Sequence, residues 1–184
     1  MIEAPATSND EVIAVAEMTS VLDIKPSPEK VGTGIQQSER RDIAQDLSQI
    51  LADSYLLVIK SHVYHWNVVG PLFRSIHEMT EQHYEEIFEA CDVLAERIRA
   101  LGFPAPMSKN GVLADGTVTL GPIAPSAHEM VQDLVQDHEA LCRKMRKVAE
   151  NADEVGDLVT ADLLTQRLAY HEKVAWMLRA VIAE

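Results

Sequence analysis

Residues 65–102 read HWNVVGPLFRSIHEMTEQHYEEIFEACDVLAERIRALG. Gly70 and Pro71 separate two predicted helices, because proline has no amide hydrogen to donate within a helix and glycine favours turns. The second helix is predicted from about residue 72 to residue 101, and Gly102 ends it. This stretch therefore predicts two long helices joined by a short turn.

The second of these helices carries two pairs of residues that can bind metal ions. His77 and Glu81 are four residues apart, and so are Asp92 and Glu96, so each pair lies on one helix face. Glu81 and Asp92 are about three helical turns apart, which places both pairs on nearly the same face. Imidazole and carboxylate together suit iron(II), with zinc, manganese and cobalt as competitors.

A single helix cannot bring these two pairs together. His77 and Asp92 are separated by roughly 22 Å along a helix axis. If they serve one site, its halves must come from different chains. Two antiparallel copies of the helix about a two-fold axis would place His77 and Glu81 of one chain opposite Asp92 and Glu96 of the other. Such an interface is self-complementary and would create two equivalent sites.

Two further histidines, His62 and His65, lie near the end of the first helix and are three residues apart. Both side chains can face the start of the second helix. Without further context, an ordinary solvated helix surface is the favoured interpretation of such a pair, and the same alternative applies to the acidic pairs. Spacing alone leaves both interpretations open.

The usual di-iron site of a four-helix bundle is not expected. That site uses a Glu-x-x-His motif on each of two helices. None of the seven histidines has a glutamate three residues before it, since those positions hold Ile59, His62, Arg74, Thr80, Pro125, Val135 and Leu168.

The rest of the chain predicts where the first helix begins, and it predicts two further helices. A first helix begins near Ser38, a third runs from Ser126 to about residue 151, and a fourth runs from about residue 157 to residue 183. Ser126 and Glu129 form a capping box at the start of the third. Periodic apolar residues give these helices their buried faces: Ile43, Leu47, Ile50, Leu51, Leu57, Val58, Met130, Leu134, Leu141, Met145, Val148, Leu164, Leu168, Ala175, Leu178 and Ile182. The expected fold is all-α, a four-helix bundle with a long connection between its second and third helices.

Domain organisation follows from proline and glycine content. Residues 1–37 contain three prolines and two glycines and are expected to form a flexible tail. Residues 38–184 are expected to form one four-helix domain.

The charge balance excludes a general nucleic-acid-binding surface. The chain has 29 acidic and 16 basic residues, for a net charge of −13, whereas phosphate binding relies on Lys and Arg. The expected tail is also acidic, so DNA binding is not expected. Cys91 and Cys142 show no disulfide pattern, and neither a signal peptide nor a membrane-spanning stretch is expected. A cytoplasmic location is expected.

The chain resembles the Dps family of mini-ferritins. The resemblance rests on His65-Trp66-Asn67-Val68-x-Gly70-x-x-Phe73-x-x-x-His77-Glu78 and on Asp92-x-x-Ala95-Glu96-Arg97-Ile98 followed by Leu101-Gly102. Residues 160–179 also resemble the last helix of that family, and the similarity extends over residues 40–184.

The resemblance implies a ferritin-like fold, a hollow shell of twelve subunits and a ferroxidase site at each two-fold interface. It implies that His65, His77 and residue 81 come from one subunit, and Asp92 and Glu96 from its partner. Two features depart from the family pattern. Glu81 stands where the family usually has aspartate, and His62 is an additional histidine that can act as an extra ligand.

The resemblance also suggests roles for residues outside the ligand set. Trp66 is expected beside the site, where it can intercept an oxidising radical or simply pack. Packing is the favoured role, because a tryptophan at a helix end is most often part of the core. Acidic pores for iron(II) are expected near the start of the last helix, where Asp153, Glu154, Asp157 and Asp162 are candidates; a solvated helix start explains these acids equally well.

The expected function is oxidation of iron(II) by hydrogen peroxide or dioxygen, storage of iron(III) within the shell, and protection against oxidative stress. His65, His77, Asp92 and Glu96 are the expected catalytic residues, and Glu81 and His62 complete the expected metal ligands. Iron is the expected metal, with zinc as a competitor. The alternative is a homo-oligomeric cage that sequesters zinc or iron without redox turnover, or that has only a structural role.

Overall fold

The computed structural model describes residues 23–107, 116–119, 121 and 123–183. Residues 1–22, which make up most of the expected tail, lie outside the described residues. The prediction of a flexible tail therefore stays a prediction.

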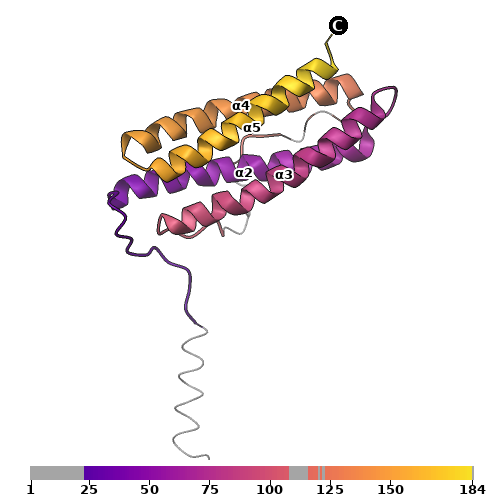
Figure 1. The fold of residues 1–184 in the computed structure, drawn as a ribbon. Coiled ribbons are helices and arrows are strands. Elements are labelled where there is room, and N and C mark those ends of the chain that lie inside the picture. Colours follow the sequence, from indigo (N-terminus) through magenta and orange to yellow (C-terminus); the bar gives the residue numbers. More distant parts are fainter. Residues whose placement is uncertain (1–22, 108–115, 120, 122, 184) are drawn as a thin grey trace, which may run out of the picture.

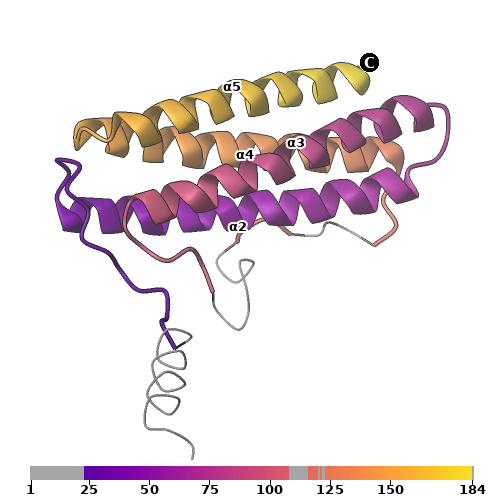
Figure 2. The same cartoon turned by 60° about the horizontal axis from the view of Figure 1, so that its bottom comes forward.

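Four helices form the domain: α2 (Gln37–Asn67), α3 (Phe73–Ala100), α4 (Ala127–Glu154) and α5 (Leu158–Val181). The predicted all-α four-helix bundle is confirmed, and the helix bounds agree with the sequence periodicity to within a few residues. Figure 1 shows two hairpins, α2 with α3 and α4 with α5, packed side by side. The described parts of the connection between α3 and α4 run along the bundle beside α2 (Figure 2).

Local sequence signals explain where the helices begin and end. The Ser126 hydroxyl accepts a hydrogen bond from the Glu129 amide, and the Glu129 carboxylate accepts one from the Ser126 amide, as the capping box predicts. Gly102 follows the C-terminal end of α3 and has a φ of +91°, in the left-handed region of backbone conformation. A Cβ atom there would lie 2.7 Å from Cγ2 of Val31, so both the backbone conformation and the space require glycine.

The predicted apolar stripes form the core. Of the sixteen residues named above, all except Ile182 are buried, and Ile182 packs against the core while partly exposed. Burial of these stripes is the main favourable contribution to the fold.

Ion pairs join α2 to α4 within the bundle. Lys60 is 0% exposed, and its ammonium group contacts the carboxylates of Asp133, at 2.9 Å, and Asp137. The buried carboxylate of Asp53 binds the Lys144 ammonium group and accepts hydrogen bonds from the Thr117 and Val118 amides. The second cluster therefore ties the long connection to both helices.

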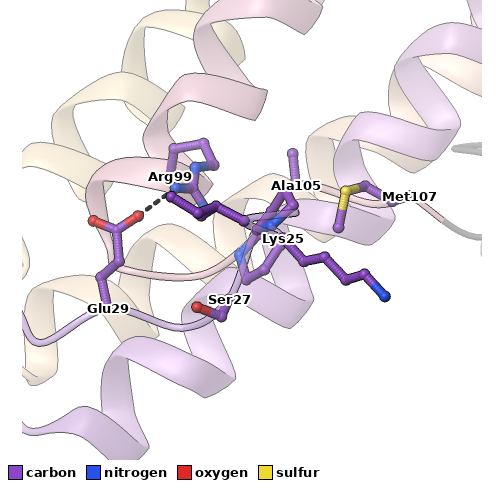
Figure 3. Close-up of a pocket in the computed structure, with 9 residues that line it drawn as sticks. Lys25, Ser27, Glu29, Arg99, Ala105 and Met107 are labelled. Carbon is purple, nitrogen blue, oxygen red and sulfur yellow. Dashed lines mark hydrogen bonds and ion pairs between the residues drawn. The ribbon is translucent and has the colours of Figure 1, made fainter. Parts of the chain in front are cut away.

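Residues before α2 pack against the end of α3. The Glu29 amide donates to the Gly102 carbonyl at 2.8 Å, and the Glu29 carboxylate pairs with Arg99. Figure 3 shows this ion pair beside a shallow pocket of about 550 Å³, with Lys25 and Met107 on its wall. Glu29 and Arg99 neutralise each other's charge. Their contact attaches the residues before α2 to the bundle.

His138 and His171 are the two most deeply buried histidines of the core, with 0% and 1% of their surface exposed. Burial is the largest cause that lowers the pKa of both rings, and it takes the pKa of His171 to about 3. The positive charge of Arg167 lowers both pKa values further.

We expect the free energy of unfolding to fall as the pH decreases below about 6.5. The folded state keeps both rings neutral, whereas the unfolded chain takes up protons at its ordinary histidine pKa. For each histidine, the free energy of unfolding falls by about 1.4 kcal/mol per pH unit. This fall continues until the pH approaches the lowered pKa of the ring in the folded state. Denaturant unfolding of chelator-treated protein from pH 7 to pH 5, at fixed protein concentration, measures this slope. A His138→Leu/His171→Leu variant provides the control, and an equal slope in both proteins would contradict the prediction.

No helix among the described residues is long and apolar enough to cross a membrane.

Candidate metal centre

His65 and His77 come together where α2 ends and α3 begins. The short turn between the two helices places their imidazole rings face to face, with ring centres 3.7 Å apart and planes at 18°. His65 is buried and His77 is half-buried. The structure thus places the ring of His65 against the start of α3, next to His77.

Two hydrogen bonds fix the orientation of the histidine pair. Nδ1 of His65 lies 2.9 Å from the backbone carbonyl of His77, and Nδ1 of His77 lies 2.9 Å from the backbone carbonyl of His65. A carbonyl can only accept, so each Nδ1 carries the proton. In a neutral ring, Nε2 then keeps its lone pair for a metal ion. Histidine ligands in metal sites are oriented by such bonds.

Tyr84 connects the histidine pair to His62. The Tyr84 ring stacks on His62 with ring centres 3.8 Å apart, and its edge meets His65 at 5.4 Å. Sequence reasoning missed Tyr84, although its position seven residues after His77 places it on the same face of α3. His62 therefore lies beside the histidine pair within one aromatic cluster.

Trp66 stacks on the outer side of His62, with ring centres 5.4 Å apart. It is 68% exposed in the single chain, and its expected place beside an inter-subunit site stays a prediction. A helix end presents side chains to both the interior and the surface, and position alone does not choose between them.

Glu81 is exposed and follows His77 by one turn of α3. Reduced hydration, followed by the negative charges of Glu81 and Glu85, raises the pKa of the Tyr84 phenol. The Glu81 carboxylate is therefore near Tyr84, on the side of α3 that carries the histidine pair.

Asp92 and Glu96 are exposed farther along α3, away from the histidine pair. Within the described part of the chain, no three His, Cys, Asp or Glu side chains are already gathered around one point where a metal ion would sit. The structure thus brings His65 and His77 together within the chain, and it does not join them to Asp92 and Glu96.

Exposed apolar residues accompany the acidic pair on α3. Phe88 lies one turn before Asp92, and Val93 lies directly after Asp92. The side chains of Phe88 and Val93 are about half exposed. Large exposed apolar side chains next to potential ligands are typical of a protein–protein interface. In an antiparallel pairing of two α3 helices, one register opposes His77 to Glu96 and Glu81 to Asp92. Its two-fold axis passes between residues 86 and 87, next to Phe88.

One of the candidate pore acids has a different role. Asp157 is buried at the start of α5, where its carboxylate accepts hydrogen bonds from the Thr160 amide at 3.1 Å and from Arg97 at 2.6 Å. The prediction that Asp157 lines an acidic pore is wrong, because this carboxylate caps α5 and joins it to α3. Asp153, Glu154 and Asp162 are exposed near the same helix start, and Asp153 and Asp162 border one shallow surface pocket.

Known proteins resemble this chain over most of its length. The model of the ferritin-like domain matches residues 44–184. A low-temperature-induced protein of Nostoc sp. is 46% identical over 156 residues, covering 83% of this chain and 87% of that protein. The DNA protection during starvation protein of Brevibacillus brevis is 35% identical over 150 residues, covering 82% of this chain and 98% of that protein.

A solved structure gives the same result for the fold. The Dps protein of Vibrio cholerae, described as a member of a broad superfamily of ferritin-like diiron-carboxylate proteins, aligns with a TM-score of 0.78 and 26% identity. The alignment covers 88% of this chain and all of that one. The helical hairpins, the long connection and these matches together show that the chain belongs to the Dps family of ferritin-like proteins.

Proposed function

We propose that this protein is a ferroxidase and an iron-storage protein whose catalytic sites form between subunits. Each site takes His65, His77 and Glu81 from one subunit, and Asp92 and Glu96 from its two-fold partner. His62 is an additional ligand candidate because Tyr84 holds it beside the histidine pair.

The observation that carries this proposal is the pair of reciprocal hydrogen bonds between His65 and His77. In the neutral form of each ring, these bonds place the proton on Nδ1 and leave the Nε2 lone pair for a cation. The histidine pair is therefore ready to bind a cation before the cation arrives, and it loses little side-chain entropy on binding. The ferritin-like diiron-carboxylate description of the Vibrio cholerae relative supports iron as that cation.

The proposed reaction removes one electron from each of two iron(II) ions. Hydrogen peroxide accepts both electrons, its O–O bond breaks, and two protons complete two water molecules. With dioxygen as the acceptor, two electrons and two protons give hydrogen peroxide. Hard carboxylate ligands such as Asp92, Glu96 and Glu81 favour iron(III) over iron(II) and so promote electron loss.

The proposal includes a closed homo-oligomer, a shell of twelve subunits, that stores the iron(III) product and thereby limits oxidative stress. The exposed Phe88 and Val93 support an interface on α3. Zinc is the expected competitor at the histidine-rich half of the site. With its excess of acidic residues, the chain is not proposed to bind DNA directly.

Iron oxidation by wild type, His65→Ala and Asp92→Ala tests the proposal. Metal-free protein is mixed anaerobically with iron(II), hydrogen peroxide or air is added separately, and the iron(III) absorbance is followed. We expect both variants to oxidise iron about 100-fold more slowly, since loss of groups that hold a metal costs about 10–100-fold even outside the direct ligand set. Shell size is checked for each protein.

The alternative function, a cage without redox turnover, predicts a different result. In that case, wild type binds iron(II) or zinc but oxidises iron no faster than buffer. That outcome would remove the ferroxidase proposal while leaving metal binding by the histidine pair intact.

A further inference from the structure

Three histidines from three different helices meet inside the bundle, away from the histidine pair. His83 belongs to α3, His138 to α4 and His171 to α5, and we refer to them as the core histidines. They are 4%, 0% and 1% exposed, respectively. Nδ1 of His138 lies 2.8 Å from Nδ1 of His171, and the rings of His83 and His138 are 5.8 Å apart between centres.

Hydrogen bonding leaves this cluster incomplete. One proton is shared between the facing Nδ1 atoms of His138 and His171. Nδ1 of His83 is buried, and within the described part of the chain it has no hydrogen-bond partner, so it is free to act as a third donor beside the two Nδ1 atoms. Nε2 of His138 also lacks a partner there, but it cannot bind an ion that is bound by Nδ1 of the same ring. Buried polar atoms without a partner are costly, and each such atom in a native protein calls for an explanation, such as a bound ion or water molecule.

Two of the three ring spacings, those that involve His138, are close to the spacing expected in a site for one metal ion. In a tetrahedral site with metal–nitrogen distances of about 2.0–2.1 Å, two imidazole nitrogens lie about 3.4 Å apart and their ring centres about 5.2 Å apart. The ring centres here are 4.9 Å apart for His138 and His171 and 5.8 Å for His83 and His138. The Nδ1–Nδ1 distance of 2.8 Å must open by about 0.6 Å to admit a metal ion. Small rotations of the rings provide this change, because the ring torsion of histidine has a broad energy minimum. Until the rings rotate, no three donor atoms among the described residues surround one point where a metal ion would sit.

We propose that the core histidines form a second metal site within each subunit, separate from the inter-subunit site. Its cation is a borderline divalent ion, represented by zinc(II) or cobalt(II), because all three donors are imidazole nitrogens. Three histidines with a water molecule as the fourth ligand are a known zinc arrangement.

The surroundings agree with neutral histidine ligands. The three rings are almost completely excluded from water, and metal ions bind the neutral form of imidazole. The nearby carboxylate of Glu86 is bound by Arg167, with one N–O distance of 2.8 Å, so it is not free to act as a ligand. Because the site is enclosed, its cation must exchange slowly and resist brief treatment with a chelator, unlike a cation at an exposed interface.

Metal content in a background without the inter-subunit site tests this proposal. A variant that carries His65→Ala, His77→Ala, Asp92→Asn and Glu96→Gln serves as the parent protein, because it lacks both halves of the inter-subunit site. Each further variant is refolded with cobalt(II) or zinc(II), treated briefly with a chelator and analysed for metal per chain. We expect one retained cation per chain in the parent, with the strong visible absorption of four-coordinate cobalt(II). His138→Leu and His171→Leu in the same background must lose it.

His128→Ala is the matched control, since His128 is an exposed histidine on α4, and this variant must retain the cation. Helix content and shell size establish that each variant folds. His83→Leu leaves the bond between His138 and His171 intact, and it must weaken retention at least tenfold even if the other variants fail to fold. A parent that retains no cation, or core variants that retain as much as the parent, would overturn the proposal. The readout is metal content, so it is independent of whether the inter-subunit site oxidises iron.

Discussion

Shells assembled from two inactive variants are expected to recover about one quarter of the wild-type rate of iron oxidation. The first variant carries His65→Ala and His77→Ala, and the second carries Asp92→Asn and Glu96→Gln. Each variant alone has every inter-subunit site defective, so neither is expected to oxidise iron faster than buffer.

The expected recovery follows from the two-fold symmetry of the proposed interface. Random pairing of equal amounts of the two variants makes about half of all dimers mixed. In a mixed dimer, one site receives both defective halves and the other receives both intact halves. About one quarter of all sites is then intact, and the rate should follow that fraction.

Co-expression of the two variants with different affinity tags allows the mixed shells to be isolated and assayed. Mixing the two variants after separate assembly is the control, because intact shells that do not exchange subunits should stay inactive. If mixed shells of confirmed composition oxidise iron no faster than either parent, the sites are not shared between subunits. The register of α3 against α3 would then have to be abandoned.

Replacement of Lys60 by methionine is expected to lower the free energy of unfolding by about 3–5 kcal/mol. The Lys60 ammonium group is fully buried between the carboxylates of Asp133 and Asp137. Burial is the largest influence on the pKa of the Asp137 carboxyl and raises it, whereas Lys60 lowers it. Without Lys60, two mostly buried carboxylates face each other with no cation between them.

Chemical denaturation at pH 7 and fixed protein concentration measures this loss. The double variant Lys60→Met/Asp137→Leu is the matched comparison, because it removes one of the two unpaired carboxylates and should regain part of the loss. A Lys60→Met protein as stable as wild type would contradict the view that this cluster holds α2 against α4.

Much of the fold follows from the order of residues along the chain. Helical periodicity predicts which residues are buried because each long helix must cover one apolar face, and fifteen of the sixteen residues named from the pattern are buried. Ser126 with Glu129 marks a helix start, and Gly102 marks a helix end, through interactions a few residues apart. The face of α3 shared by His77, Glu81, Asp92 and Glu96 is also a property of spacing within one helix.

Side-chain environments depended on contacts between helices. Trp66 and Asp157 have ordinary positions at helix ends, and only the packing shows that Trp66 is exposed and that Asp157 is buried against Arg97. The core histidines are 33 or more residues apart along the chain. Their sequence positions have in common only that each lies on the apolar stripe of its helix.

The sequence by itself determined the four helices, their buried faces and the two ligand pairs on α3, because these are local, periodic properties. Only the tertiary structure decided which ring nitrogens of His65 and His77 carry protons, that Tyr84 joins them to His62, and that three histidines meet inside the bundle. Those features depend on distances across helix interfaces, where displacements of about 1 Å decide whether a hydrogen bond forms.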